Sequence, residues 1–411
     1  MRGFSNILWR AVLVCGVLAG LAACAMGPGQ LEAGAEGSEE LFPRNYLESR
    51  AQFRTDCAAA AQKPRDICAH WTVPSPTDPD LTVDYGIFSR GGDRLLVIQS
   101  GIHGTEAASG AAVQAYVMRK ILPELLAKGI DVVFIHALNP WGFKNGRRND
   151  EFNVNLNRNF SANGKIFDFS NPDYRRFRGV FEPPGPVGSL FWGAANVAAG
   201  FAAGYIANGF DSKSLANGLD NGQYEFPAGI NYGGRGPQPQ TGFLRQSIGP
   251  VLARPYRKTL YLDFHTGLGE NGVLAVILGK APAPGPMRDL QGMLEAQESR
   301  GIKIVTPNDP GFFPTEGDVI DFVPSLAARP AAFLAVTMEY GTVGIGAAAQ
   351  LQSASRMILE NQKYNHGCAT QTACDTIDRE TREMFNPSGA GWRQAVIREA
   401  DLVFRILIEK F

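Results

Sequence analysis

The chain has 411 residues, of which 45% are hydrophobic and 19% are charged. This composition is typical of a folded globular protein with a large core, and it excludes general disorder, a coiled coil and a collagen-like fibre. Lys and Arg number 39 against 40 Asp and Glu, a net charge of -1, so no basic field favours nucleic acid as a partner. The 47 glycines and 26 prolines indicate many loops on a compact scaffold, as expected of an enzyme or a binding protein.

Residues 1–23 have the pattern of an export signal. Arg2 and Arg10 precede a short apolar run, and small residues lead up to Cys24. The run is too short to span a bilayer as a helix, which takes about 20 apolar residues. The pattern resembles a bacterial lipoprotein signal, which implies cleavage before Cys24, a lipid on Cys24 and attachment to a membrane outside the cytoplasm. An ordinary secretory signal is the alternative, and it also predicts export.

The segment that follows the signal is expected to be a tether. Residues 24–40 are rich in Gly, Ala and Glu without apolar periodicity, which favours a flexible link between lipid and domain. Ala25 after the cysteine resembles the pattern for sorting to the outer membrane, with the domain in the periplasm. Membrane contact through this lipid is the only membrane partner that the sequence predicts.

The cysteines agree with export. Without Cys15 in the signal and Cys24 at the lipid, four cysteines remain, and they form two close pairs. In an exported protein this spacing favours two local disulfides, Cys57 with Cys68 and Cys368 with Cys374.

The middle of the chain predicts an α/β fold. A continuous apolar run at 95–99, a helical pattern over 107–128 and a second apolar run at 132–135 form a βαβ unit. Strands that are apolar on both faces indicate a mostly parallel or mixed twisted sheet with helices on both sides. Three more runs of this kind are expected in the same sheet, at 259–264, 273–278 and 333–338.

One domain is expected from residue 41 to residue 411. A stretch rich in Gly, Pro, Asn and aromatics at about 162–258 is interpreted as an insertion that passes over the sheet, not as a second domain. The amphipathic residues 392–411 predict a closing helix.

Chemically competent side chains follow three of the predicted core strands. His103 and Glu106 come after the strand at 95–99, His265 after that at 259–264, and Glu339 after that at 333–338. In an open α/β sheet the crevice outside the carboxyl ends of the strands is where ligands bind. Two His and one Glu with an open fourth position make up a catalytic zinc site in hydrolases. A satisfied polar residue at a strand end is the alternative for His103.

The order of four motifs, HGTE, NVNLNRNF, DFHTG and EYGT, resembles zinc carboxypeptidases of the M14 kind, and more narrowly the bacterial DUF2817 branch of M14-like metallopeptidases. The resemblance covers about residues 80–345. It implies one Zn²⁺ held by His103, Glu106 and His265, with Glu339 as the general base.

The resemblance also implies how substrate is held. Asn157 and Arg158 correspond to the pair that binds the terminal carboxylate, and Arg148 best matches the arginine that polarises the scissile carbonyl, with a shift to Arg147 left open. Asn155 stands where the family usually has Asp, which is expected to weaken the charge balance around Arg158. The base of the specificity pocket is expected near 312–318.

The other histidines are given structural readings. His136 lies inside a predicted strand and is expected to be a hydrogen-bonded core residue, whereas His70 and His366 are expected in surface loops. Asp263 shares a strand face with His265, so it is either structural or a support for that histidine.

Three functions follow from these observations. The first is a zinc-dependent carboxypeptidase that acts outside the cytoplasm on peptides or cell-wall peptide. The second keeps the zinc and hydrolyses an N-acyl amino acid, since aspartoacylase-like deacylases resemble the same arrangement. The third is a lipid-anchored protein that binds peptides without cutting them. The first two predict a peptide or acyl-amino-acid substrate with a free carboxylate, and the oligomeric state stays open.

Overall fold

The computed structural model describes residues 39–411 except 208, 210, 268, 295–301, 308 and 310–314. The signal, Cys15, Cys24 and nearly all of the expected tether lie outside the described residues. The last two tether positions, Glu39 and Glu40, belong to a short 3-10 helix, η2 (Glu39–Leu41).

A single mixed sheet of eight strands forms the centre of the molecule, in the order β1-β2-β4-β3-β5-β8-β6-β7. The four central strands β4, β3, β5 and β8 are parallel, β2 and β6 run antiparallel to them, and the outer strands are β1 and β7. The strands are β1 (Ile67–Thr72), β2 (Thr82–Phe88), β3 (Arg94–Ser100), β4 (Ile130–His136), β5 (Lys258–Gly267), β6 (Leu274–Leu278), β7 (Lys303–Val305) and β8 (Phe333–Gly341).

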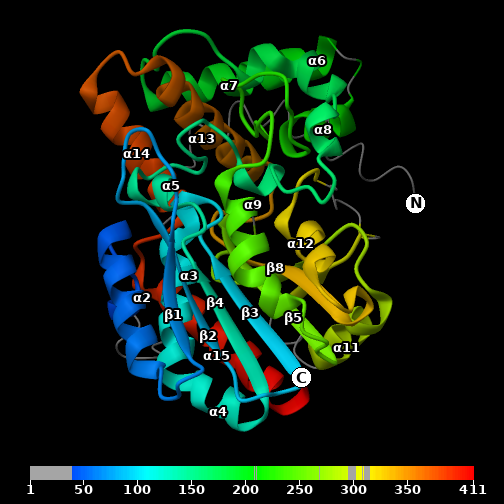
Figure 1. Ribbon diagram of the computed structural model, residues 1–411. Helices are drawn as coiled ribbons and strands as arrows, with labels where there is room; N and C mark the ends of the chain where they lie inside the picture. The colour runs from blue at the N-terminus through cyan, green and yellow to red at the C-terminus, as the bar shows by residue number, and fades with distance from the viewer. Residues whose placement is uncertain are drawn as a thin grey trace.

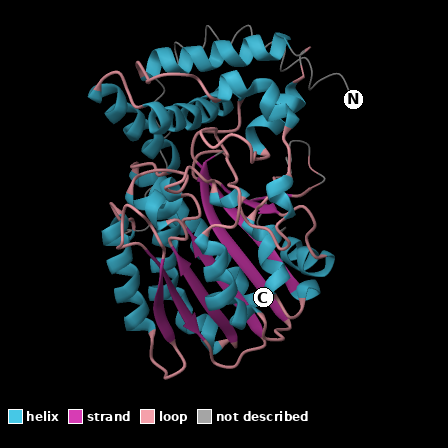
Figure 2. Ribbon diagram, turned by 45° about the horizontal axis from the view of Figure 1, so that its top comes forward, coloured by secondary structure: helices cyan, strands magenta, loops and turns pink. Residues whose placement is uncertain are grey.

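Helices cover both faces of this sheet (Figures 1 and 2). Because successive strand residues point to opposite faces, each central strand supplies two separate cores. In β3, Leu96 and Ile98 enter one core, and Leu95 and Val97 enter the other. The α/β fold with helices on both faces is therefore as the sequence predicts.

One face carries the helices that connect or close the central strands. The predicted helix over 107–128 is present as three consecutive segments, with a π-helical turn in the middle. The helices on this face are α2 (Tyr46–Ala60), α3 (Ala107–Tyr116), η4 (Val117–Ile121), α4 (Leu122–Ala127), α11 (Pro284–Leu294) and α15 (Ala390–Lys410). The last of these is the closing helix expected at 392–411.

The opposite face is covered by shorter helices. Their apolar residues, among them Phe243, Ile248 and Phe322, pack on Tyr261 and on the alternate residues of β3 and β4. These helices are α9 (Pro239–Phe243), η7 (Leu244–Ile248), α10 (Gly249–Leu252), α12 (Val319–Phe322) and η9 (Val323–Leu326).

A third apolar cluster lies beyond the carboxyl ends of the central strands, where the insertion meets two helices from the C-terminal part of the chain (Figure 1). Phe177, Phe181 and Phe201 of the insertion pack there with Ile358 and Ile377. The helices involved are α6 (Pro172–Phe181), α7 (Leu190–Ala207), α8 (Ser212–Asp220), α13 (Ala347–His366) and α14 (Gln371–Phe385). The insertion is thus anchored by α13 and α14.

Helix α7 has an unusually apolar exposed surface. Within the described part of the chain it is the one helix that is long and apolar enough to cross a membrane by length and composition, with a mean hydropathy of 1.3 and 17% of its residues buried. Phe191 and Trp192 at its start and Ile206 near its end are exposed. A single exposed apolar helix of this kind is weak evidence for a span.

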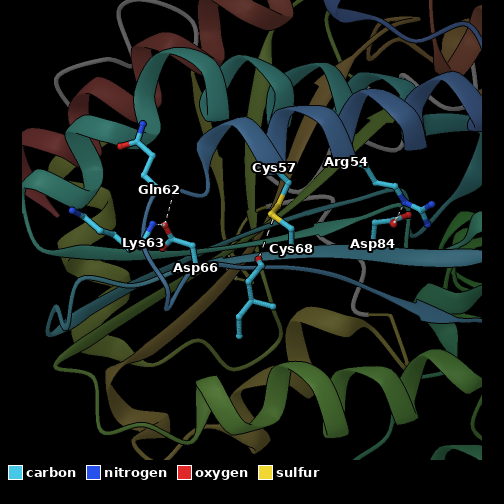
Figure 3. The surroundings of a disulfide bond; sticks show 8 residues. Arg54, Cys57, Gln62, Lys63, Asp66, Cys68 and Asp84 are labelled. Carbon is cyan, nitrogen blue, oxygen red and sulfur yellow. Dashed lines mark hydrogen bonds and ion pairs between the residues drawn. A yellow bond between two sulfur atoms is a disulfide. The ribbon is translucent and has the colours of Figure 1, made fainter.

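Both disulfides join the cysteines that the spacing favours. Cys57 of α2 pairs with Cys68 of β1, and Cys368 pairs with Cys374 of α14. Figure 3 shows the first bond linking α2 to the edge strand, with the ion pair of Arg54 and Asp84 beside it. The bond therefore secures the outermost strand on that side of the sheet.

Two histidines expected in loops lie in regular structure. His70 is in β1, and His366 is the last residue of α13. The expectation rested on neighbouring cysteines, but disulfide bonding here occurs within or next to regular elements. Both side chains are exposed.

Candidate metal centre

The loop after β3 delivers His103 and Glu106 to the carboxyl end of the sheet. The chain leaves β3 through Gly101, whose φ of 70° is in the left-handed region that favours glycine. Gly104 then passes so close to the next turn that an added Cβ would lie 2.1 Å from the carbonyl carbon of Gly142. Glu106 ends the 3-10 helix η3 (Gly104–Glu106), and α3 begins at the next residue.

His265 and Glu339 lie side by side on the neighbouring parallel strands. The sequence placed both just beyond their strands, but β5 continues to Gly267 and β8 to Gly341. The register pairs His265 with Glu339 directly, so that both side chains project on the same face of the sheet. The longer strands fix these two groups more rigidly than loops would.

The structure brings His103, Glu106 and His265 together as a buried cluster. Their ligand atoms all lie within 4.8 Å of one another. Nδ1 of His103 is 2.9 Å from Oε1 of Glu106, and Nδ1 of His265 is 3.2 Å from Oε2 of the same carboxylate. The contact of Nδ1 of His103 with Glu106 does not have hydrogen-bond geometry, and this buried nitrogen has no other hydrogen-bond partner among the described residues. Two imidazoles and one carboxylate arranged in this way fit the ligand set of a catalytic zinc ion.

The outer nitrogen of each histidine is held by a separate partner. Nε2 of His265 is 2.7 Å from Oδ2 of Asp263, whose Oδ1 accepts a hydrogen bond from Nε2 of Gln99 at 2.8 Å. Nε2 of His103 is 3.1 Å from Oδ1 of Asn155. Such partners fix the ring orientation and leave Nδ1 for a metal. Asp263 therefore supports His265, one of the two roles considered for it.

The side chain of Asn155 contacts a different residue from the one expected. The sequence associated this position with Arg158, but the side chain lies against a predicted metal ligand, His103. An amide here carries no charge, whereas Asp263 behind His265 does. The two histidines are thus supported unequally.

The three members of the cluster differ in their electrostatics. Burial and the nearby Arg148 guanidinium lower the pKa of His103 to about 3, so this imidazole is neutral. Burial opposes charge on His265 as well, but Asp263 and Glu106 together hold its pKa well above the ordinary value. Although burial alone would raise the pKa of Glu106, the two histidines keep it below its usual range. Glu106 is therefore anionic and His103 neutral, as metal binding requires, whereas His265 carries a proton that it would release when a metal binds.

Glu339 lies next to the cluster and does not belong to it. The side chain is half-buried, and its Oε1 would be 3.1 Å from a Cβ added at Gly267. Burial, together with the negative charge of Glu106, raises the pKa of Glu339 to about 8. A carboxylate with a raised pKa is suited to proton transfer near neutral pH.

Arg148, and not Arg147, reaches the cluster. Nε of Arg148 is 3.9 Å from Oε1 of Glu106, and its Nη1 donates to Oδ1 of Asn231 at 3.0 Å. Burial lowers the pKa of Arg148 to about 10, a value at which the guanidinium stays charged at neutral pH. Arg147 instead pairs with Glu360 of α13 and stacks on the ring of Tyr364 at 3.5 Å. Arg147 therefore ties the loop to α13.

The predicted carboxylate-binding pair lies at the edge of the site next to α8 and α12. Each nitrogen of Arg158 donates to a backbone carbonyl: Nε and Nη2 to Asp220 at 3.0 and 2.8 Å, and Nη1 to Asn157 at 2.8 Å. Nδ2 of Asn157 donates to Asp318 at 3.1 Å. Both side chains are buried. The end of the insertion's helix α8 thus holds the guanidinium, so Arg158 already has protein partners where the resemblance expects a substrate.

His136 is a core residue in β4. Its Nδ1 is 3.0 Å from Oε1 of Gln114, its Nε2 is 3.2 Å from Oγ of Ser49, and its ring stacks on Phe53 with centroids 4.6 Å apart. Burial lowers its pKa to about 3. Of the segment 312–318, residues 312–314 lie outside the described residues, and Asp318 caps α12.

Asn231 is a site residue that the sequence did not indicate. Oδ1 of Asn231, in the insertion, accepts from Arg148 and also from Nδ2 of Asn155 at 2.7 Å. Its own Nδ2 donates to the carbonyl of Leu219 at 2.6 Å, and its φ is 50°. Asn tolerates this left-handed conformation better than most residues. The NYGG stretch signals only a turn, so nothing local reveals these contacts.

A family model matches most of the described chain. The model of DUF2817, a family described as a protein of unknown function, matches residues 42–399, and the chain belongs to this family. A search of curated proteins gave no significant match.

Several solved structures resemble the chain in fold. They include carboxypeptidase A from Helicoverpa armigera (12% identity, 91% of this chain and 80% of that one, TM-score 0.46). Bovine thrombin-activatable fibrinolysis inhibitor is 13% identical over 84% of this chain and 99% of its own, with a TM-score of 0.45. Succinylglutamate desuccinylase from Chromobacterium violaceum is 13% identical over 82% and 74%, with a TM-score of 0.34. Similarities at this level do not assign an activity.

Proposed function

We propose that the protein is a zinc-dependent hydrolase of amide bonds, most specifically a carboxypeptidase that acts on peptides or cell-wall peptide. The observation that carries the proposal is the buried cluster of His103, Glu106 and His265 with Glu339 alongside it on the neighbouring strand. A metal-assisted hydrolase needs at least three protein ligands for the ion and an acidic group beside them that can transfer a proton.

In this proposal His103, Glu106 and His265 hold one Zn²⁺. When bound, the ion supplies Lewis acidity, which lowers the pKa of water from about 16 to about 7 and polarises a carbonyl. Glu339 accepts the proton of the attacking water and delivers it to the leaving amine. The Arg148 guanidinium stabilises the negative charge that develops on the carbonyl oxygen, a contribution whose removal costs about 10²- to 10³-fold in rate.

The carboxypeptidase assignment depends on Asn157 and Arg158, which the motif resemblance links to a free terminal carboxylate. A guanidinium suits bidentate capture of that group. The nitrogens of Arg158 already donate to the carbonyls of Asp220 and Asn157. Capture of a substrate carboxylate therefore requires further N–H groups of the same guanidinium to face the substrate.

A second candidate is a zinc-dependent N-acyl amino acid deacylase. The close packing of Arg158 against the end of α8 is the observation in its favour, because a short acyl amino acid needs less space there than a peptide. An added Cβ at Gly222, just after α8, would lie 2.9 Å from Cδ of Arg158. A non-catalytic peptide-binding role has less support, since every ligand and the base are retained.

We also propose that the protein works outside the cytoplasm on a lipid anchor at Cys24, in the outer membrane facing the periplasm. The signal pattern of residues 1–23 supports export, and the two disulfides suit an oxidising compartment.

The experiment is to incubate the zinc-loaded protein with a mixed peptide library carrying free or amidated C-termini and to identify products by mass spectrometry. Loss of single residues from free C-termini alone is the expected result. Hydrolysis of N-acyl amino acids without any peptide cleavage would favour the deacylase. Hydrolysis of neither class would contradict the proposed function.

A further inference from the structure

A small cavity opens beside the metal ligands, on the side where the insertion meets α13 and α14. It is bounded by Arg148, by Ile230 of the insertion, by Met357 and Glu360 of α13, and by Thr381 and Phe385 of α14. None of the roles described above uses this cavity. It nevertheless shares Arg148 with the metal site, because Nε of that residue lies 3.9 Å from Glu106.

The cavity also adjoins the general base. The ring of Phe385 is 3.6 Å from the position that a Cβ would take at Gly267, and Oε1 of Glu339 is 3.1 Å from the same position. The carbonyl of Phe385 accepts a hydrogen bond from Thr266, the residue after the metal ligand His265. Helix α14 is therefore fastened to the metal-bearing strand at the edge of the cavity.

Two side chains in the cavity wall, Thr381 and Arg148, have a hydrogen-bond donor without a partner among the described residues. Oγ1 of Thr381 has no hydrogen-bond partner within the described parts of the chain, although this residue is only 2% exposed. Arg148 donates from Nη1 to Asn231, and its buried Nε has no hydrogen-bond partner among the described residues. A buried donor without a partner is unfavourable, which makes such a group a candidate for contact with a ligand.

The negative charge in the wall is already neutralised. Glu360 binds the Arg147 guanidinium through both carboxylate oxygens. Oδ1 of Asn231 accepts from two side chains. The polar groups of the cavity wall that can still donate hydrogen bonds are therefore the Arg148 guanidinium, whose ion pair with Glu106 is long at 3.9 Å, and the Thr381 hydroxyl, with Ile230, Met357 and Phe385 as apolar neighbours.

The cavity and the pair predicted to bind the terminal carboxylate border different helices. Arg158 and Asn157 contact the end of α8 and the residue before α12, whereas the cavity is walled by α13 and α14. Figure 1 shows these two pairs of helices on opposite sides of the carboxyl end of the sheet. A substrate that spans the metal ligands would reach both places with its two ends.

We propose that this cavity is a substrate subsite for a carboxylate, carried by the residue or acyl group on the carbonyl side of the scissile bond. This inference rests on the proposed amide hydrolase. The carboxylate accepts from Arg148 and from Thr381, while the methylene groups that carry it pack against Met357 and Phe385. Thr381 is the residue that sets the preference for an acidic group over an apolar one of similar size.

The test uses N-acetylated dipeptides that end in phenylalanine and carry Glu, Gln or Leu before the scissile bond. Their dissociation constants are measured by calorimetry with the zinc-loaded full-length Glu339→Gln protein, so that binding is read without turnover. The Glu peptide is expected to bind about tenfold more tightly than the Leu peptide, with Gln between them. Thr381→Val, which keeps the shape and removes the hydroxyl, is expected to reduce the ratio of Glu to Leu affinity by about fivefold, the size of one hydrogen bond.

Thr372→Val is the matched control, because Thr372 lies on the same helix, α14, and is exposed. It is expected to leave the ratio unchanged. Equal affinity for the three peptides, or a Glu preference that Thr381→Val leaves intact, would overturn the subsite. Hydrolysis is assayed separately with the wild-type protein: a Glu preference in binding without any amide hydrolysis would contradict the proposed function and leave the subsite standing.

Discussion

The two histidines of the cluster, His103 and His265, differ in the hydrogen-bond partner of Nε2. His265 is backed by the carboxylate of Asp263, and His103 by the neutral amide of Asn155. A carboxylate partner raises the basicity of an imidazole ligand more than an amide does. The amide also allows Asn231 of the insertion to join the network, since Nδ2 of Asn155 donates to it. The insertion therefore takes part in the hydrogen-bond network behind His103.

Glu339 gives the residue-scale prediction. Glu339→Gln removes the proton acceptor and preserves the size of the side chain, so turnover is expected to fall by about 10²- to 10⁴-fold. Zinc content is expected to stay at one ion per chain, because Glu339 is not among the three clustered ligands. The measurements are kcat on a cleaved peptide and zinc by mass spectrometry.

Glu124→Gln on the exposed side of α4 is the matched control, and it is expected to keep both activity and zinc. A Glu339→Gln protein that keeps full activity would remove Glu339 from the role of general base.

At the scale of elements, a buried histidine of β4, His136, packs against α2. His136 has a pKa of about 3 in the folded protein against an ordinary value of 6.5, because of its burial. Between these two pH values the unfolded chain binds the extra proton, so the free energy of unfolding is expected to fall as the pH is lowered from about 6.5.

His136→Gln should flatten that pH dependence, which denaturant titrations at a series of pH values would show. His70→Gln on the exposed face of β1 is the control and should keep it. An unchanged slope in His136→Gln would mean that other groups cause the acid sensitivity.

The disulfides make a second prediction at this scale. The Cys57–Cys68 bond closes a loop with a sequence separation of 11, and the Cys368–Cys374 bond one of 6. The loop-entropy model gives about 3 kcal/mol and about 2 kcal/mol for their stabilisation. Cys57 is also fully buried in the main core, so replacing the first pair by Ala is expected to lower the melting temperature more than replacing the second. The opposite order in calorimetry would contradict this view of the edge strand.

At the scale of the whole molecule, the sequence predicts the central sheet well. Strands β3, β4, β5 and β8 are buried on both faces, so each reads as a continuous apolar run that local pattern reveals. The same runs locate His103, Glu106, His265 and Glu339, because parallel strands bring their carboxyl ends together.

The contacts across the insertion could not be predicted in this way. The bonds of Asn231 to Arg148, of Glu360 to Arg147 and of Asp220 to Arg158 join segments separated by more than 60 residues. They depend on how α6 to α8 pack against α13 and α14, and no local periodicity encodes that packing. The partner of Asn155 was misjudged for the same reason.

Membrane attachment is a prediction for the full chain. Cys24→Ser removes the proposed site of lipid attachment, so the protein is expected to move from the membrane fraction to the soluble fraction while the folded domain keeps its activity. Fractionation of cells and labelling with a fatty-acid analogue measure this. Retention of Cys24→Ser in the membrane fraction without label would point to another contact, for which the exposed apolar face of α7 is the first place to look.

The most direct test of the proposed metal centre is zinc removal from the wild-type protein, with zinc content and amide hydrolysis measured on the same sample. One zinc per chain, loss of activity on chelation, recovery with one equivalent of Zn²⁺ and no zinc in His103→Ala are the results predicted. Full activity in a sample with less than about a tenth of an equivalent of any metal would contradict a mechanism in which Glu339 and Arg148 act beside a bound ion.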